Sequence, residues 1–489
     1  MYHRCILIVL LTLALTACAT PTAASVPLPT SQAVDFIAQA DALIQAGQYE
    51  QAIDMYDRAI EAEPNLADLY YRRGLAYFGL DQFEPAIADF STALELNPQA
   101  VNAYQARGHA SAQLGRIAAA LADFTRWIEL APDQPEAHLA RGKIYYEQGE
   151  FDSARSDLDR AIELAPSSAE AYLYRARVFQ STEDYESAFS DLERVIELTP
   201  QDSEAYRERG NLHAQLGQTP QAMADYEQAL ALQPEDYRIF FLRGALYIRQ
   251  QDFESALQDF DRVVELAPDF PDGRYNRALL RAEMGLLQES LEDWSVLIDS
   301  FPLEPLYYSQ RSLVYRSLNQ FESALADINQ AIILAPQNAA LYAERAQLFA
   351  SRSDTARARA DFDAALALDP VDPSLYLLRG NFRSDQGQYA QAIEDFDQSL
   401  LLDPNLAEAH LRRGAANYYL NRHAEAIEDF TRCIELTPDF PGVYFNRALT
   451  YRAIGSIQEA IDDIDTFLKL ETDTGERQKG QELLALLKK

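Results

Sequence analysis

Twelve prolines recur along the chain at a constant interval of 34 residues. They are Pro64, Pro98, Pro132, Pro166, Pro200, Pro234, Pro268, Pro302, Pro336, Pro370, Pro404 and Pro438. Proline makes up only 22 of the 489 residues, so an unbroken series of this length does not arise by chance. A fixed period of 34 residues is typical of chains that stack one pair of helices on the next. The sequence therefore predicts an all-α solenoid.

Each proline closes a repeat with the same pattern of small residues. In the second repeat, Gly74 and Ala86 lie 24 and 12 residues before Pro98. Small side chains at both positions let two antiparallel helices approach closely. A glycine such as Gly115 commonly stands 17 residues before the proline, where it suits a left-handed turn. We therefore expect helix, tight turn and helix in every repeat, with no linker between residues 33 and 474.

The repeat resembles the tetratricopeptide repeat. In the second repeat the residues that carry this resemblance are Tyr70, Gly74, Tyr77, Ala86, Phe90, Ala93 and Pro98. The resemblance implies an α-α superhelical solenoid of about thirteen helix-turn-helix repeats over residues 33–474. Residues 475–489 are then expected to form a helix that caps the last repeat. The family also implies a concave groove, lined by the first helices, that binds partners.

Two charged positions accompany the repeat. In every repeat but the first, an arginine lies 25 residues before the proline position and an aspartate nine residues before it, as with Arg73 and Asp89. The first repeat lacks both and has Gln39 and Met55 instead. Because both members are missing together, we expect the arginine and the aspartate to pair within each repeat. The alternative is a ladder of arginines that binds an acidic ligand.

The first 32 residues differ from the repeats. In residues 1–17, Arg4 precedes an apolar stretch from Ile6 to Leu15, which is typical of a signal peptide. The segment Leu15-Thr16-Ala17-Cys18 resembles a bacterial lipobox, which implies cleavage before Cys18 and acylation of that residue. An ordinary signal peptide cleaved nearby is the alternative. Residues 18–32 would then form a flexible tether, because Ala19 to Gln32 carry no charge.

The implied location is the bacterial cell envelope. A chain acylated at Cys18 would be lipid-anchored in the outer membrane if the cell has one, because Ala19 rather than aspartate follows the cysteine. Otherwise it would lie on the outer face of the plasma membrane. The net charge of −34 disfavours binding to nucleic acid or to anionic lipid, so we expect membrane contact only through the anchor.

The sequence offers little for catalysis. Beyond Cys18 the only cysteine is Cys433, and no paired spacing of cysteine or histidine suits a metal. His138 and His410 replace the first-helix tyrosine, so we expect them to be packed or partly exposed repeat residues rather than catalytic bases. No glycine-rich phosphate loop is present. We therefore expect no enzymatic activity, no cofactor, no metal and no small-molecule substrate.

Candidate partner-binding residues lie two before, two after and five after the arginine position. They are Leu139, Lys143, Tyr146, Leu173, Arg177, Arg207, Asn211, Phe241, Tyr418 and Phe445. Apolar side chains at such positions are typical anchors for peptides, although they could instead pack against neighbouring first helices. The carboxylate clamp of chaperone-binding family members is absent, because Leu242 and Asp272 replace its later polar and basic residues.

These features predict a non-catalytic scaffold or adaptor that binds peptide segments or protein partners in its groove. The alternatives are a lipoprotein that recruits cell-wall enzymes or assembles pili, and a structural spacer without a ligand. Our hypothesis places the main ligand over repeats four to seven, where basic and acidic groove residues balance. The alternative is that Lys143, Arg177 and Arg207 are neutralised by glutamates on adjacent helices.

Overall fold

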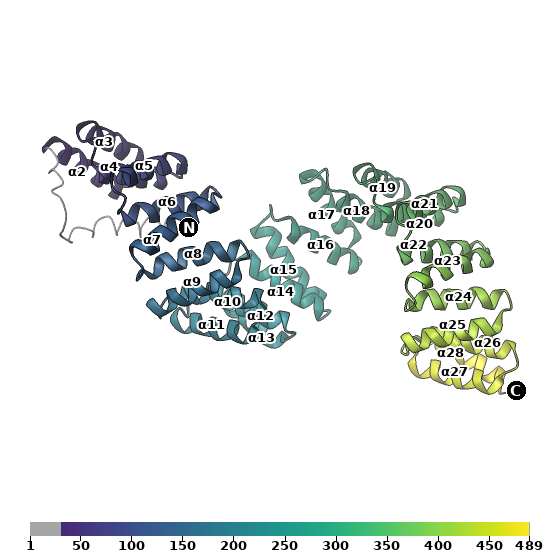
Figure 1. Cartoon of the computed structure of the whole chain (residues 1–489). Helices are drawn as coiled ribbons and strands as arrows, with labels where there is room; N and C mark the ends of the chain where they lie inside the picture. The colour runs from purple at the N-terminus through teal and green to yellow at the C-terminus, as the bar shows by residue number, and fades with distance from the viewer. Residues whose placement is uncertain (1–30, 489) are drawn as a thin grey trace. The chain divides into compact units, whose positions relative to one another are not determined.

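The computed structural model describes residues 31–488, and the regular elements in this range are α-helices (Figure 1). This arrangement confirms the predicted all-α fold. The predicted signal peptide and the predicted lipidation site Cys18 lie outside the described residues. No helix between residues 31 and 488 is long and apolar enough to cross a membrane.

The helices alternate between first and second members of a pair. The first helices are α2 (Ser31–Gln45), α4 (Ala67–Gly79), α6 (Val101–Gln113), α8 (Pro135–Glu147), α10 (Ala169–Ser181), α12 (Ser203–Gln215), α14 (Tyr237–Arg249), α16 (Pro271–Glu283), α18 (Pro305–Ser317), α20 (Ala339–Ser351), α22 (Pro373–Asp385), α24 (Ala407–Tyr419) and α26 (Pro441–Ala453). The second helices are α3 (Tyr49–Ala62), α5 (Phe83–Leu96), α7 (Ile117–Leu130), α9 (Phe151–Leu164), α11 (Tyr185–Leu198), α13 (Thr219–Leu232), α15 (Phe253–Leu266), α17 (Leu287–Ser300), α19 (Phe321–Leu334), α21 (Thr355–Leu368), α23 (Tyr389–Leu402), α25 (His423–Leu436) and α27 (Ile457–Leu470). The predicted terminal helix is α28 (Thr474–Leu487).

The chain forms two compact units that divide between Leu246 and Tyr247, inside α14. Within each unit, first and second helices pack as hairpins, and successive hairpins stack through neighbouring helices such as α5 and α6 or α23 and α24. In the second unit, α28 covers the end of the array, because Leu483 and Leu487 are buried against Ala448 and Ile464.

Small residues permit the close helix contact in each hairpin. A methyl group added at Gly380 would lie 2.5 Å from the ring of Phe396, which is too close for any real contact. Gly108 and Phe124 show the same approach at 2.6 Å. The turns also follow the prediction, because Gly115 has a φ of 68°. Such left-handed backbone favours glycine, which lacks a Cβ atom.

Eleven of the predicted ion pairs within the repeats are confirmed. Arg345 of α20 donates from Nε and Nη2 to the two carboxylate oxygens of Asp361 on α21, both at 2.8 Å. Equivalent pairs join Arg73–Asp89, Arg107–Asp123, Arg141–Asp157, Arg175–Asp191, Arg209–Asp225, Arg277–Asp293, Arg311–Asp327, Arg379–Asp395, Arg413–Asp429 and Arg447–Asp463.

The same arginine also binds the preceding repeat, which the sequence analysis missed. Nη1 of Arg345 donates to Oδ1 of Asn329 on α19 at 2.7 Å. In other repeats the acceptor, always 16 residues before the arginine, is Asp57, Ser91, Thr125, Asp159, Asp261, Ser295, Asp363, Asp397 or Thr431. Each of these arginines therefore joins three helices.

The first-helix tyrosine and its histidine replacements anchor the loop before them. The hydroxyl of Tyr444 donates to the carbonyl of Pro438 at 2.9 Å. Nε2 of His138 lies 3.1 Å from the carbonyl oxygen of Pro132, and Nδ1 of His138 lies 3.3 Å from Asp157. His138 and His410 are buried, so the predicted packing of both side chains is confirmed.

Replacing Arg345 by methionine should lower the local free energy of unfolding of α20 and α21 by about 3–5 kcal/mol, because Asp361 would remain buried without its partner. Amide hydrogen exchange measures this local opening. Arg432→Met is the control, since its surface pair with Glu435 is worth about 0–1 kcal/mol. Additive effects of Arg345→Met and Asp361→Asn in a double-mutant cycle would contradict the pairing.

Candidate functional site

The predicted groove residues all lie on first helices. In the first unit, α8 carries Leu139, Lys143 and Tyr146, whereas α10 carries Leu173 and Arg177. The remaining candidates are Arg207 and Asn211 on α12, Phe241 on α14, Tyr418 on α24 and Phe445 on α26. The structure therefore gathers seven of the ten on three successive first helices of the first unit.

Ion pairs connect these three helices. Nζ of Lys143 on α8 lies 2.7 Å from Oε1 of Glu170 on α10. Nη2 of Arg177 on α10 lies 2.7 Å from Glu204 and 2.9 Å from Glu208, both on α12. Each cation therefore binds a carboxylate of the next first helix. This arrangement matches the alternative in which the groove charges neutralise one another.

Arg207 extends the network toward α14. Its Nη2 atom lies 3.1 Å from Glu204 and 3.2 Å from Glu208, and its Nη1 atom lies 3.5 Å from Asp236. The Arg207 side chain is buried, and Asp236 also accepts from the neighbouring Arg238. Arg207 thus serves to hold carboxylates of its own helix and of the loop before α14 in place.

An aromatic side chain contacts two of these cations. The Tyr174 ring centroid is 4.8 Å from Nζ of Lys143 and 5.0 Å from Cζ of Arg177. Tyr146 meets the same ring edge to face at 6.0 Å. Cation–π contacts of this kind hold the cationic groups over the ring. The sequence analysis missed Tyr174, which lies directly before the arginine position and outside the three columns considered.

The apolar candidates contribute to packing. Leu173 is buried with Leu192 in the core of its hairpin, and Leu139 and Tyr146 pack against Leu158. In the second unit the Phe445 ring lies 5.2 Å from Phe467. The other three candidates, which are Phe241, Tyr418 and the polar Asn211, are partly buried. Of these, Asn211 accepts a hydrogen bond from the Tyr226 hydroxyl at 2.8 Å.

His109 lies on α6, close enough to Lys143 for that ammonium to affect its pKa. Its ring meets Phe124 at 5.1 Å and Trp127 at 6.4 Å. Burial, with a smaller effect of the Lys143 ammonium, lowers the pKa of His109 to about 4. The side chain is therefore neutral at physiological pH.

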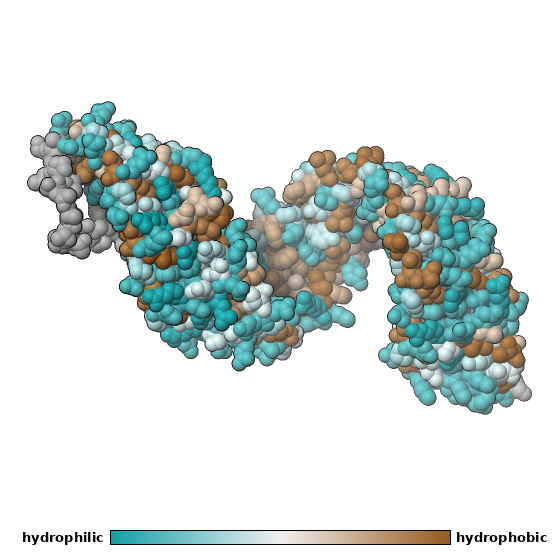
Figure 2. Space-filling model, in the orientation of Figure 1, coloured by the Kyte–Doolittle hydropathy of each residue, from teal (hydrophilic) through white to brown (hydrophobic). Residues whose placement is uncertain are grey.

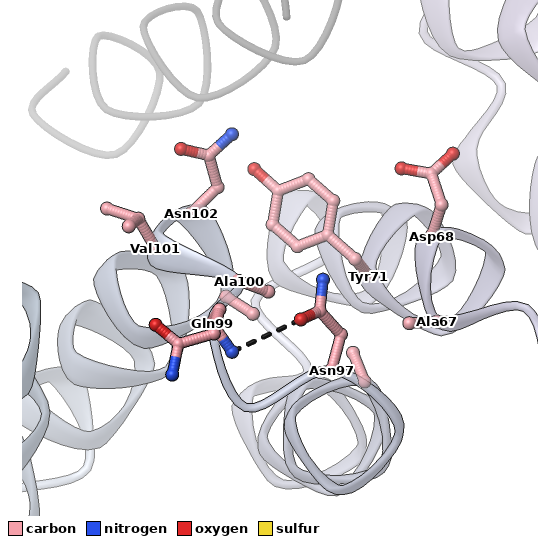
Figure 3. A pocket seen from close by; sticks show the side chains of 10 residues that line it. Ala67, Asp68, Tyr71, Asn97, Gln99, Ala100, Val101 and Asn102 are labelled. Atoms are coloured by element: carbon pink, nitrogen blue, oxygen red, sulfur yellow. Dashed lines mark hydrogen bonds between the residues drawn. The ribbon is translucent and has the colours of Figure 1, made fainter. Parts of the chain in front are cut away.

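A pocket of about 300 Å³ lies where the α5–α6 loop meets the start of α4 (Figure 3). Asp68, Tyr71, Asn97 and Asn102 supply its polar lining, and Oδ1 of Asn97 accepts from the backbone of Gln99 at 3.1 Å. The buried Tyr71 hydroxyl makes no hydrogen bond to any described residue. Burial raises the pKa of Tyr71, so this hydroxyl keeps its proton and remains a hydrogen-bond donor.

The low pKa of His109 makes stability depend on pH. The unfolded chain takes up a proton near pH 6.5 and the folded chain only near pH 4, so acid favours the unfolded state between these values. Between about pH 7.5 and pH 5, the free energy of unfolding of the wild type should fall more steeply than that of His109→Gln, by up to about 1.4 kcal/mol per pH unit. Thermal unfolding at a series of pH values measures this difference. Equal losses in both proteins would show that His109 is not the responsible group.

Comparison with known proteins points to one family. Models described as tetratricopeptide repeat match residues 67–99, 139–203, 175–246, 213–282, 312–383 and 407–440. A model described as TPR repeat matches residues 40–81, 108–149 and 380–421. No curated protein sequence matches the chain significantly.

Solved structures resemble the chain at low sequence identity. Yeast Tom70 is 16% identical, with 93% of this chain and 95% of Tom70 covered and a TM-score of 0.47. A tetratricopeptide repeat protein from Parabacteroides merdae is 21% identical, with 51% and 98% covered and a TM-score of 0.44. YrrB, described as a TPR protein with an unusual peptide-binding site, is 25% identical, with 36% and 91% covered and a TM-score of 0.33. Because the family models together match more than half of its residues, the chain belongs to the tetratricopeptide repeat family.

Proposed function

We propose that this protein is a non-catalytic scaffold or adaptor that binds a peptide segment or protein partner on the face formed by α8, α10 and α12. The observation that carries the proposal is the cluster of Lys143, Tyr174 and Arg177, which offers two cations and an aromatic ring on adjacent first helices. Membership of a family of protein-interaction repeats supports a binding role.

The exposure of the ion-pair partners favours a particular exchange. The Arg177 side chain is 18% exposed, whereas its partner Glu204 is 41% exposed. A carboxylate of the partner can therefore replace Glu204 at Arg177 while Glu204 keeps its ion pair with Arg207, 3.1 Å away. Glu208 would still balance part of the charge, because its oxygen lies 2.9 Å from Arg177. The proposed ligand is a peptide with an acidic side chain or terminus beside a small apolar surface.

The proposed setting is the bacterial cell envelope. The apolar stretch and the Leu15-Thr16-Ala17-Cys18 segment support export and acylation of Cys18. The anchored chain would lie in the outer membrane, or on the outer face of the plasma membrane where no outer membrane exists. A scaffold held in this way would bring its partner to the membrane surface.

Partner binding is tested with the chain as bait in detergent-solubilised envelopes. The captured partner should bind Lys143→Gln/Arg177→Gln more than about tenfold more weakly than wild type, because the cationic pair is gone. Circular dichroism should show the same helix content. The matched control is Arg160→Gln/Arg194→Gln, which removes two exposed cations from the second helices α9 and α11. Equal affinity for wild type and the groove variant would refute the site.

Lipidation has its own test. In a bacterial host, radiolabelled palmitate should enter the wild-type chain, and mass spectrometry should place the mature N-terminus at Cys18. Cys18→Ser should remain unprocessed and unlabelled, because the acylated group is the cysteine. Label that persists in the serine variant, or a mature N-terminus beyond residue 19, would contradict the lipoprotein assignment.

A further inference from the structure

The pocket between the α5–α6 loop and α4 has a wall of small apolar side chains. Its volume of about 300 Å³ is at the lower end for sites that bind small molecules. Five aliphatic residues form this wall, namely Ala67, Ala93, Ala100, Val101 and Ala103. None of them is larger than valine, so the wall suits a ligand group about the size of a methyl.

Tyr71 is the lining residue whose polar group the described part of the fold leaves unsatisfied. The residue is only 7% exposed, and its buried hydroxyl makes no hydrogen bond to any described residue. A buried hydroxyl without a partner lowers the stability of a fold. Burial also raises the pKa of Tyr71, so the hydroxyl keeps its proton and its O–H needs an acceptor. A ligand with an acceptor oxygen would supply that partner.

Two asparagines bring amide groups to the same pocket. Oδ1 of Asn97 accepts from the backbone N–H of Gln99 at 3.1 Å, so Nδ2 of Asn97 is the atom that can donate to a ligand. Figure 3 shows the side-chain amide of Asn102 on the same side of the pocket as the Tyr71 hydroxyl. The Asn102 amide offers both an N–H donor and a carbonyl acceptor. A ligand group that contains a carbonyl and an N–H therefore matches the polar lining.

The charges around the pocket favour a neutral ligand. Among the described residues that line it, Asp68 alone is charged, and Oδ2 of Asp68 already lies 2.6 Å from Nε of Arg72. A cationic ligand would compete with Arg72 for this carboxylate. The face of the first unit in Figure 2 is mostly hydrophilic, and the chain carries a net charge of −34, so an anion is repelled as it approaches.

We propose that this pocket binds the acetamido group of a small neutral ligand. The ligand carbonyl has two lone pairs, so it accepts from the Tyr71 hydroxyl and from Nδ2 of Asn97. The ligand N–H donates to Oδ1 of Asn102, and the acetyl methyl packs against the aliphatic wall. Each polar and apolar part of the acetamido group thus meets a matching part of the pocket.

The burial of Tyr71 favours a terminal group over a peptide bond within a chain. A peptide bond continues on both sides, whereas an acetamido group ends in a methyl and can enter a narrow site from one side. N-acetylated amino sugars and N-acetylated peptide ends both carry this group, and separate probes distinguish them. The proposal does not rest on the partner-binding face of α8, α10 and α12.

Saturation-transfer NMR on the full chain tests the proposal with small probes. N-acetylglucosamine represents the amino sugars and N-acetylalanine methylamide represents the peptide ends, whereas glucose lacks the acetamido group. At least one acetamido probe should receive saturation, most strongly at its acetyl methyl, because that methyl lies against the aliphatic wall. Glucose should receive none. The probe that binds identifies the source of the group, and binding of both would show that the acetamido group alone is recognised.

Tyr71→Phe removes only the hydroxyl. It should raise the dissociation constant of the bound probe about two- to tenfold, because one neutral hydrogen bond is lost. The melting temperature should stay equal or rise, since no described residue bonds this hydroxyl. Tyr275→Phe is the matched control and should leave probe binding unchanged, because Tyr275 holds the same repeat position on α16 and does not line the pocket.

Asn97→Asp tests the second donor. Asp369 and Asp403 hold the equivalent place in other repeats and accept from the backbone two residues later, at 3.2 and 2.9 Å, so the loop should be kept. The substitution replaces the Nδ2 donor by an acceptor and should weaken probe binding more than about tenfold.

Four results would overturn the proposal. They are no saturation of either acetamido probe, equal saturation of glucose, full probe affinity in both Tyr71→Phe and Asn97→Asp, and a lower melting temperature of Tyr71→Phe. The last result would show that the hydroxyl already has a partner within the chain.

Discussion

The guanidinium of the repeated arginine is the group on which the stacking of repeats depends. Its planar fork of N–H donors binds one aspartate of its own hairpin with two bonds and an acceptor of the preceding repeat with a third, as Arg345 does with Asp361 and Asn329. Lysine could not make this contact, because its single ammonium lacks the fork. Burial raises the pKa of Asp191 and Asp395 even beside their arginines. The pair therefore fixes register mainly by penalising arrangements that leave a carboxylate buried and unpaired.

The candidate binding face of α8, α10 and α12 also pairs cations with carboxylates of a neighbouring helix, but these carboxylates are exposed. Lys143 and Arg177 are satisfied by glutamates of the next helix, so an incoming partner must exchange an existing ion pair rather than fill an empty site. In the proposed exchange Glu204 would keep its contact with Arg207 and its exposure to water. In the proposed complex, apolar and aromatic contacts around Tyr174 would add to the binding that the exchanged charges provide.

The repeat period, the hairpin turns and the arginine–aspartate pairs were predictable from the sequence, because each depends on a constant offset within one repeat. The third arginine contact is also encoded, since an acceptor precedes Arg107, Arg175 and Arg345 by 16 residues, but it joins two repeats, so the pattern within a single repeat does not reveal it. Exposure was not predictable in the same way. Leu173 and Arg207 hold groove positions by spacing yet are buried, because neighbouring helices decide what covers a side chain.

The arginine contact also gives the array a direction of growth. Arg73 reaches back to Asp57 in the first repeat, whereas the first repeat has Gln39 and Met55 in place of the arginine–aspartate pair. In ten of the twelve later repeats the arginine binds the repeat before it. A nascent chain, which leaves the ribosome from its N-terminus, thus adds each hairpin to a neighbour that is already folded and ready to receive it. Assembly then proceeds by successive local steps, without waiting for distant parts of the chain.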